Sequence, residues 1–246
     1  MVMEFKWLLF IRIAVMSVFL LLEGTTYACL EHERIALLQL KPFFNHYDEL
    51  VDWDKPKGSD CCRWKGIECN TTTRRLVGLT LNSTRDSSEG WYLNASLFLP
   101  FVGLKRLYLR GNAIAGCIEN EGFRWFSRLL NLGTLDLSWN PLGNDIMFQL
   151  SSLSSLKNLS LRSIDLEGEL LHIQGLNNLT NLRYLDLNSN SIESILNKDE
   201  TQLRLANLER LDLSANFFRN TLSFLEGLSG LKSIDIEQRF ARLIIC

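Results

Sequence analysis

Leu104-Lys-Arg-Leu107-Tyr-Leu109-Arg-Gly-Asn112 is the stretch of sequence that decides the fold. Its spelling, Leu-x-x-Leu-x-Leu-x-x-Asn, returns in the same phase along most of the 246-residue chain. Complete copies begin at Leu104, Leu132, Leu182 and Leu208, and weaker copies begin at Leu76, Leu156 and Leu231. Successive first leucines are therefore 28, 28, 24, 26, 26 and 23 residues apart. This regular recurrence predicts a stack of similar structural units.

The paired leucines within each copy distinguish strands from helices. On a helix, Leu107 and Leu109 would lie roughly 200° apart, on opposite sides. On a strand they share one face, so each copy predicts one short strand whose leucines point inward. The asparagine that follows can hydrogen-bond backbone groups of its own coil and of the next coil, which a tight turn would otherwise leave without partners. We expect looser turns where Ile164 and Arg239 replace this asparagine.

A period of this length with this spelling is the signature of a leucine-rich repeat. The predicted fold is an α/β solenoid with about seven repeats over residues 76–240. Short parallel strands should form its concave face, with irregular or short helical segments on the convex face. Residues 241–246 should form a tail, and we expect no C-terminal cap.

Residues 1–28 have the composition of a secretory signal peptide. Lys6 and Arg12 precede the apolar run 13–22, and Thr26-Tyr-Ala28 places small residues where cleavage occurs. A membrane anchor is the competing interpretation, but the uninterrupted apolar run is only 10 residues long, well short of the ~20 residues that span a bilayer. The chain is therefore expected to be secreted, without a transmembrane segment after removal of the signal peptide.

Residues 29–75 are expected to form an N-terminal cap, because the first coil would otherwise expose its leucines to water. A short helix should run from Leu30 to Lys41 and end or kink at Pro42. Trp53 and Trp64 should pack inside the cap. Four cysteines lie in this region and leave three pairings open; they are Cys29, Cys61, Cys62 and Cys69. A zinc site is the alternative, which the secretory signal disfavours because oxidising compartments promote disulfides.

The arrangement of these cysteines resembles the N-terminal cap of plant receptor-like proteins and of polygalacturonase-inhibiting proteins. The matching residues are Cys29, the Cys61-Cys62 doublet, Trp64, Gly66 and Cys69. Residues 91–101 also resemble the receptor-like proteins, and residues 114–118 and 166–170 resemble the Leu-x-Gly-x-Ile extension of plant extracellular repeats. The resemblance implies Cys29–Cys61 and Cys62–Cys69 disulfides. It also implies an extracellular recognition protein in defence or development, with a separate receptor kinase as co-receptor.

Five Asn-x-Ser/Thr sequons predict a glycoprotein, given the signal peptide. They begin at Asn70, Asn82, Asn94, Asn158 and Asn178. Asn158 immediately precedes an inward-facing leucine, so strand alternation places it on the concave face. A glycan there would narrow the binding surface.

The outward positions of the strands form the candidate binding surface. An aspartate between the paired leucines is common in this repeat type, so we interpret the acidic column that includes Asp136 and Asp186 as structural. Exposed aromatic side chains flanked by arginines are more specific contact candidates. These candidates are Arg106, Tyr108, Arg110, Trp139, Arg162 and Tyr184. Solvated strand positions without a partner are the alternative interpretation.

Composition and motifs argue against several classes of function. The chain is 46% apolar and 22% charged with a net charge of −2, so it lacks the basic excess of a nucleic-acid-binding protein. His32, His46 and His172 are scattered, and the sequence contains no nucleophile motif or phosphate loop. We therefore expect no enzyme activity, no cofactor and no metal. Cys117 is expected to be a small buried apolar residue, and the fate of Cys246 stays open.

The predicted function is recognition of a peptide, protein or glycan on the concave face. Two alternatives stay open. One is a secreted inhibitor of a microbial cell-wall hydrolase, like the polygalacturonase-inhibiting proteins, although those carry more repeats and a C-terminal cap. The other is a non-functional fragment of a longer receptor, because the chain resembles only the first quarter or so of one.

Overall fold

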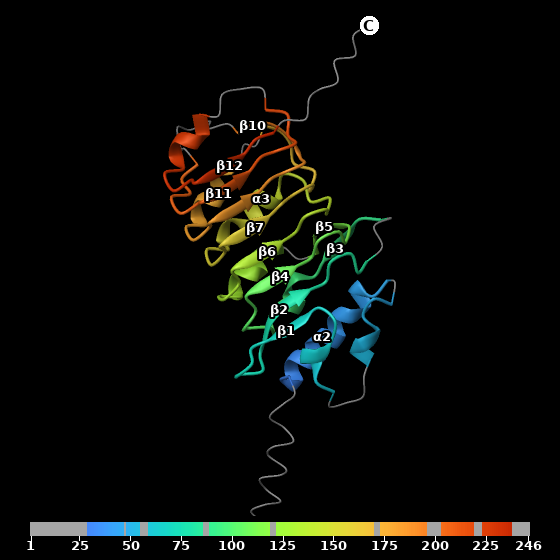
Figure 1. The fold of residues 1–246 in the computed structure, drawn as a ribbon. Helices are drawn as coiled ribbons and strands as arrows, with labels where there is room; N and C mark the ends of the chain where they lie inside the picture. Colours follow the sequence, from blue (N-terminus) through green and yellow to red (C-terminus); the bar gives the residue numbers. More distant parts are fainter. Residues whose placement is uncertain are drawn as a thin grey trace, which may run out of the picture.

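The structure, a computed structural model, describes residues 29–46, 48–54, 59–85, 89–118, 122–169, 173–195, 203–218 and 223–237. In this part of the chain, successive coils stack on one another and rise from the cap to the last strand (Figure 1). The predicted signal peptide and the predicted tail with Cys246 lie outside the described residues, as do Arg239 and His172.

One sheet runs the length of the stack. Its order is β1-β2-β4-β6-β7-β9-β11-β12, so each coil adds one strand beside the strand of the coil before it. All neighbours are parallel except β1 and β2. The strands are β1 (Ile67–Cys69), β2 (Leu76–Thr80), β4 (Arg106–Tyr108), β6 (Thr134–Asp136), β7 (Asn158–Ser160), β9 (Tyr184–Asp186), β11 (Arg210–Asp212) and β12 (Ser233–Asp235). The predicted solenoid with parallel strands is confirmed.

Short helical segments connect the strands. They are η3 (Ala95–Phe98), η4 (Gly122–Arg128), α3 (Ile146–Gln149), η5 (Leu150–Ser152), η6 (Ile173–Asn178) and η7 (Ser223–Gly227). Two small parallel sheets, which the sequence did not predict, accompany the main sheet. They pair β3 (Trp91–Leu93) with β5 (Ile114–Cys117), and β8 (Glu167–Glu169) with β10 (Ser191–Ser194). Strands β5 and β8 lie in the two segments that resemble the Leu-x-Gly-x-Ile extension.

The leucines of the repeated pattern form the core. Leu107 and Leu109 are fully buried, and the paired leucines of the other complete copies are at most 2% exposed. Burying one such side chain contributes about 1.5–3 kcal/mol before the loss of conformational entropy is counted. Each coil obtains this burial only by stacking on its neighbours.

Buried asparagines join each coil to the one before it. The Asn140 Nδ2 atom donates to the carbonyl oxygens of Leu109 at 3.0 Å and Leu137 at 2.8 Å. Its Oδ1 atom accepts from the backbone N–H groups of Asn112 at 3.1 Å and Ile114 at 2.9 Å. One amide thereby satisfies buried backbone groups of two coils, as the sequence predicted.

The looser turn expected at Ile164 is not observed. The residue before it, Ser163, is left-handed with φ 50°, like Ser189 with φ 55° before Asn190. Ile164 is fully buried, and its backbone carbonyl accepts from the N–H groups of Leu142 at 3.2 Å and Gly143 at 2.8 Å. A main-chain carbonyl thus accepts the hydrogen bond of the Leu142 N–H. In other coils an asparagine side chain accepts from the equivalent N–H, such as those of Ile114 and Ile192.

The cap begins with helix α2 (Glu31–Phe44), which passes through Pro42. The expected helix end at Lys41 was wrong, because the helix continues through the proline to Phe44. Proline removes one helical hydrogen bond, but the last residue of the helix is held by packing. Phe44 is fully buried, with its ring centroid 5.6 Å from that of Trp91 and 6.4 Å from that of Phe98.

Two disulfides close the rest of the cap, which contains η1 (Val51–Asp54) and η2 (Cys61–Arg63). Cys29 pairs with Cys61 and Cys62 pairs with Cys69, with Cα–Cα distances of 5.5 and 5.6 Å. The pairing implied by the family resemblance is confirmed. Trp53 and Trp64 are at most 2% exposed, with ring centroids 5.7 Å apart, so they pack inside the cap as expected.

Candidate functional site

The open face of the eight-stranded sheet presents aligned columns of side chains, because alternation turns these positions away from the buried leucines. The column at the start of the strands is Arg106, Thr134, Asn158, Tyr184 and Arg210. The column at the end of the strands is Tyr108, Asp136, Ser160, Asp186 and Asp212. All the predicted contact residues therefore lie on or directly after these strands.

Three of the predicted contact residues gather in one place, and we call them the tryptophan cluster: Arg110, Trp139 and Arg162. They follow β4, β6 and β7 on three successive coils. The Trp139 N–H donates to the Arg162 carbonyl at 2.8 Å. The guanidinium carbon of Arg110 lies 5.7 Å from the centroid of the Trp139 ring. Trp139 is 49% exposed and both arginines are exposed, so the cluster offers cations and an aromatic face to a partner.

The backbone at Trp139 shows that the fold does not demand a large residue there. Trp139 is left-handed with φ 59°. The other coils have small residues at this left-handed position, namely Gly111, Ser163, Ser189 and Ala215. A bulky residue in this region costs of order 1 kcal/mol or more. An exposed tryptophan at a strained position is therefore explained better by function than by folding.

Arg106 and Tyr108 lie on β4 but outside the tryptophan cluster. Arg106 forms an ion pair with Glu68 of β1, which ties it to the cap. Tyr108 is half-buried at the end of the strand. Both side chains belong to the open face, and each is separated from Trp139 along the strand direction.

Tyr184 lies on β9, in the acidic half of the open face. The guanidinium carbon of Arg210 is 5.7 Å from the Tyr184 ring centroid. Burial raises the pKa of the Tyr184 phenol, and the nearby carboxylates of Asp186 and Asp212 raise it further. Tyr184 therefore lies near carboxylates and Arg210, whereas Trp139 lies near Arg110.

The aspartates of the column at the strand ends have structural hydrogen bonds, as expected from the sequence. Each accepts a bond from the backbone N–H two residues further on: Asp136 from Ser138 at 2.9 Å, Asp186 from Asn188 at 3.0 Å and Asp212 from Ser214 at 2.9 Å. Burial raises the pKa of Asp186, while the bonds from Asn188 and the Ser160 hydroxyl lower it. These bonds fix the chain where each strand ends.

The sequons differ in accessibility. Asn82, Asn158 and Asn178 are exposed, whereas Asn70 and Asn94 are half-buried. The side chains of the half-buried pair accept backbone N–H bonds within their own turns. The Nδ2 atom of Asn158 donates to the Thr134 hydroxyl at 3.1 Å, which places it on the open face as alternation predicted.

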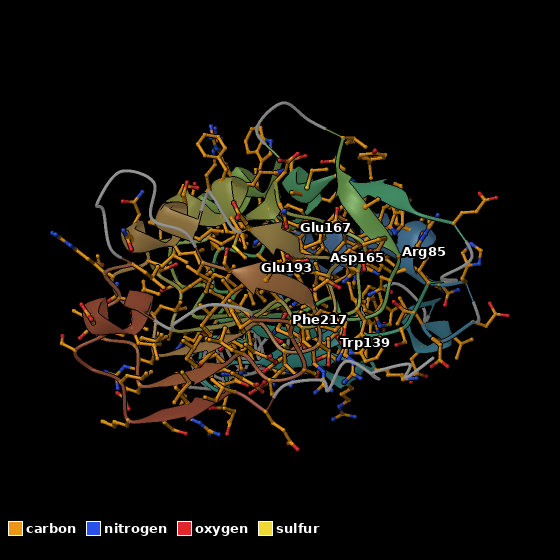
Figure 2. All side chains as sticks on the ribbon, turned by 90° about the horizontal axis from the view of Figure 1, so that it is seen from above. Arg85, Trp139, Asp165, Glu167, Glu193 and Phe217 are labelled. Carbon is orange, nitrogen blue, oxygen red and sulfur yellow. A yellow bond between two sulfur atoms is a disulfide. The ribbon has the colours of Figure 1, made fainter. Side chains whose placement is uncertain are left out.

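A second surface, which the sequence did not predict, carries acidic side chains. Figure 2 labels Glu167 on β8, Glu193 on β10 and Asp165 just before β8. Residue Glu167 lies opposite Ser191 in the register of this small sheet. The available signal was the segment Leu166-Glu-Gly-Glu-Leu170, whose extension-like spelling gave no warning that strands would pair there.

Comparison with known proteins matches both parts of this architecture. The family model "Leucine rich repeat N-terminal domain" matches residues 30–70, and the model "Leucine Rich Repeat" matches residues 181–200. Receptor-like protein 9a of Arabidopsis thaliana is 37% identical over 155 residues, which are 63% of this chain and 16% of that protein. Cuscuta receptor 1 of Solanum lycopersicum is 37% identical over 150 residues, which are 58% of this chain and 13% of that protein. The chain is therefore similar to plant receptor-like proteins with leucine-rich repeats.

Solved structures share the fold of this chain. Pollen Receptor Kinase 3 matches with a TM-score of 0.59 and 21% identity, covering 85% of this chain and 98% of that one. The BIR2 ectodomain from Arabidopsis thaliana matches with a TM-score of 0.54 and 20% identity, covering 84% and 95%. At these identities the likeness concerns the fold alone. The chain spans 16% of the length of Receptor-like protein 9a. No helix among its described residues is both long and apolar enough to cross a membrane.

Proposed function

We propose that this chain is an extracellular recognition module that binds a peptide, protein or glycan on the open face of its sheet, which is the predicted concave face. The observation that carries the proposal is the tryptophan cluster. A large aromatic side chain flanked by arginines is a typical composition for a binding hot spot. Three stacked coils hold these side chains, so little flexibility is lost when a ligand binds.

The chemistry of the proposal is non-covalent binding. We propose that the chain is not an enzyme and that a receptor kinase acts with it, as the family resemblance implies. An extracellular location is supported by the similarity to receptor-like proteins and by disulfides, which persist in oxidising compartments. The matched relatives are named as receptors, so the alternative of a hydrolase inhibitor gains no support from them.

The experiment uses the secreted, glycosylated chain on two arrays, one of synthetic acidic, basic and neutral peptides and one of cell-wall oligosaccharides. Any ligand retained by the wild-type chain is then titrated against a Trp139→Ala, Arg162→Ala double variant. The expected loss of affinity is at least tenfold, because alanine removes the aromatic face and one cation together. The control is Glu226→Gln, an exposed position on η7 away from the sheet.

Unchanged binding by the double variant, with affinity lost only when other surfaces are altered, would overturn the assignment of the open face. A chain that retains nothing from either array would overturn the proposed ligand classes. Inhibition of a fungal polygalacturonase by the wild-type chain would instead favour the inhibitor alternative.

A further inference from the structure

A row of residues just before the strands carries a second, unassigned feature of the open face. Its first member, Lys105, donates its backbone N–H to the Val77 carbonyl, and the backbone N–H of every later member donates to the carbonyl of the row member on the preceding coil, at 2.8–2.9 Å. The row is Lys105, Gly133, Lys157, Arg183, Glu209 and Lys232. These residues are 23–28 positions apart in sequence but are neighbours in the stack.

In the later half of this row, a carboxylate lies between two cations and pairs with both. Glu209 accepts from Arg183 at 3.2 Å and from Lys232 at 2.9 Å. The hydrogen bond from Lys232 lowers the pKa of the Glu209 carboxyl, so this group is anionic at neutral pH. The Glu209 carboxylate therefore forms ion pairs with both neighbouring cations.

The earlier half of the row has no such carboxylate. Lys105 and Lys157 lie on either side of Gly133, and none of the described residues that line the space between them is acidic. Arg106 also lines this space, although its guanidinium is engaged by Glu68. Two lysines therefore flank Gly133, at a row position where the neighbouring coils carry a side chain.

A hollow of about 420 Å³ lies between the two lysines, and Gly133 is one of the residues that line it. A Cβ atom built on Gly133 would lie 3.8 Å from the Lys105 carbonyl oxygen and 4.0 Å from Lys157 Cδ. These are ordinary van der Waals distances, so the backbone would accept a side chain here. A side chain at position 133 would therefore extend into the hollow without a clash at its Cβ atom.

We propose that this hollow binds a carboxylate group of an acidic peptide, with Lys105 and Lys157 as its two cationic walls. This inference rests on the proposed function and names the ligand chemistry of one part of that face. The hollow and the tryptophan cluster belong to the same three coils, at opposite ends of β4, β6 and β7. A short extended peptide can therefore place an acidic group in the hollow and reach Trp139.

The lining favours a peptide over an acidic glycan. No aromatic ring is among the described lining residues, so a sugar ring has no face on which to stack. Leu130, which borders the hollow, is 79% exposed and offers an aliphatic contact. The Thr134 hydroxyl accepts from Asn158, so its own hydrogen can be donated to a carboxylate.

The predicted glycosylation site has a direct consequence for the hollow. Asn158 lines it and also begins a sequon. A glycan on Asn158 would cover the space that the carboxylate needs. Occupancy of this sequon therefore competes with ligand binding, and the test must be made with the sequon removed.

The experiment titrates an acetylated tetraglutamate peptide against the full chain carrying Asn158→Gln, which keeps the amide and abolishes the sequon. Replacing Lys105 and Lys157 together by glutamine should weaken binding at least tenfold. The matched control, Arg183→Gln with Lys232→Gln, changes the net charge equally in the same row and should change affinity less than twofold. Thermal unfolding followed by circular dichroism checks that each variant is folded.

A second measurement does not depend on the choice of peptide. Gly133→Glu places a carboxylate in the hollow, and Gly133→Gln fills it with an uncharged side chain of the same shape. The Glu variant should melt at a higher temperature than the Gln variant, and the difference should vanish when Lys105 and Lys157 are glutamine. The Gly133→Glu variant should also lose tetraglutamate binding.

Equal weakening by the two paired variants would show a general charge effect and overturn the proposal. Binding of tetragalacturonate in place of the peptide, through the same two lysines, would overturn the peptide assignment in favour of a glycan. No binding of either probe, with equal melting of the two Gly133 variants, would remove the site altogether. Ligand binding that depends on Trp139 and not on the lysines would leave the proposed function intact while this inference fails.

Discussion

The Glu33 carboxylate on the cap helix accepts a hydrogen bond from the backbone N–H of Leu76, with 2.8 Å between Oε2 and N. Both residues are fully buried. The other carboxylate oxygen of Glu33 has no hydrogen-bond partner among the described residues. One side chain thus joins the cap to the first strand of the repeats while leaving an oxygen buried without a partner.

This junction makes stability dependent on pH. Burial raises the pKa of Glu33, and the Leu76 N–H and the charges of His32 and Arg75 lower it by less. A raised carboxyl pKa means that the folded state prefers the protonated form. Its contribution to stability is therefore complete at pH values below the ordinary carboxyl range and is lost as the pH rises through the folded pKa.

Glu33→Gln should remove that loss, because glutamine keeps the acceptor for Leu76 and cannot ionise. The variant is expected to be as stable as the wild type or more stable at pH 7, with the advantage shrinking on acidification. Urea unfolding between pH 4 and 8 measures it, with the exposed Glu226→Gln as the control. A wild type that gains stability relative to Glu33→Gln as pH rises would contradict the sign of this shift.

Removing one of the buried asparagines that join neighbouring coils should lower the free energy of unfolding substantially. Asn140→Ala would leave the N–H groups of Asn112 and Ile114 without their acceptor. Each buried unsatisfied group costs about 1–3 kcal/mol, so a loss of about 2–6 kcal/mol is expected for the two groups together. Denaturant unfolding measures it.

Asn207→Ala is the control for this change. Asn207 also donates from its amide to a backbone carbonyl, that of Thr180 at 2.7 Å, but in an exposed position. Its loss should cost less than about 1 kcal/mol, since water replaces the bond. Equal losses from both variants would refute the structural importance assigned to the buried asparagines.

The two disulfides of the cap should contribute unequally. The Cys29–Cys61 bond joins residues 32 positions apart, and Cys62–Cys69 joins residues 7 apart. On the chain-entropy account, the longer loop contributes about 4 kcal/mol and the shorter about 2 kcal/mol. Paired cysteine-to-alanine variants compared by urea unfolding test this order. A larger loss from the short loop would show that contacts within the folded cap outweigh loop closure.

The features that the sequence predicted are those set by residues close together in the chain, and the features that it missed depend on residues far apart. The strands followed from Leu107 and Leu109 because one local pair decides which face is buried. The hollow could not be predicted in the same way, since Lys105, Gly133 and Lys157 become neighbours only when coils of unequal length are aligned. The helix past Pro42 depends on the packing of Phe44 against residues that lie far along the chain.

Trp139 offers the sharpest separation of folding from function. Trp139→Gly removes the strain of a bulky residue at φ 59°, and Gly111 already fills the same position in the coil before. Relief of strain offsets the lost contact with Arg110 and the greater freedom of glycine in the unfolded chain. The variant should therefore stay within about 1 kcal/mol of the wild type.

Leu137→Ala, two residues earlier and fully buried, is the contrasting change and should cost about 2–5 kcal/mol. Urea unfolding of both variants gives the comparison. A Trp139→Gly chain that is as stable as the wild type but no longer binds the ligand found on the arrays would place the tryptophan in recognition. A loss of stability as large as that of Leu137→Ala would assign it to the core, because only buried packing gives a penalty of that size.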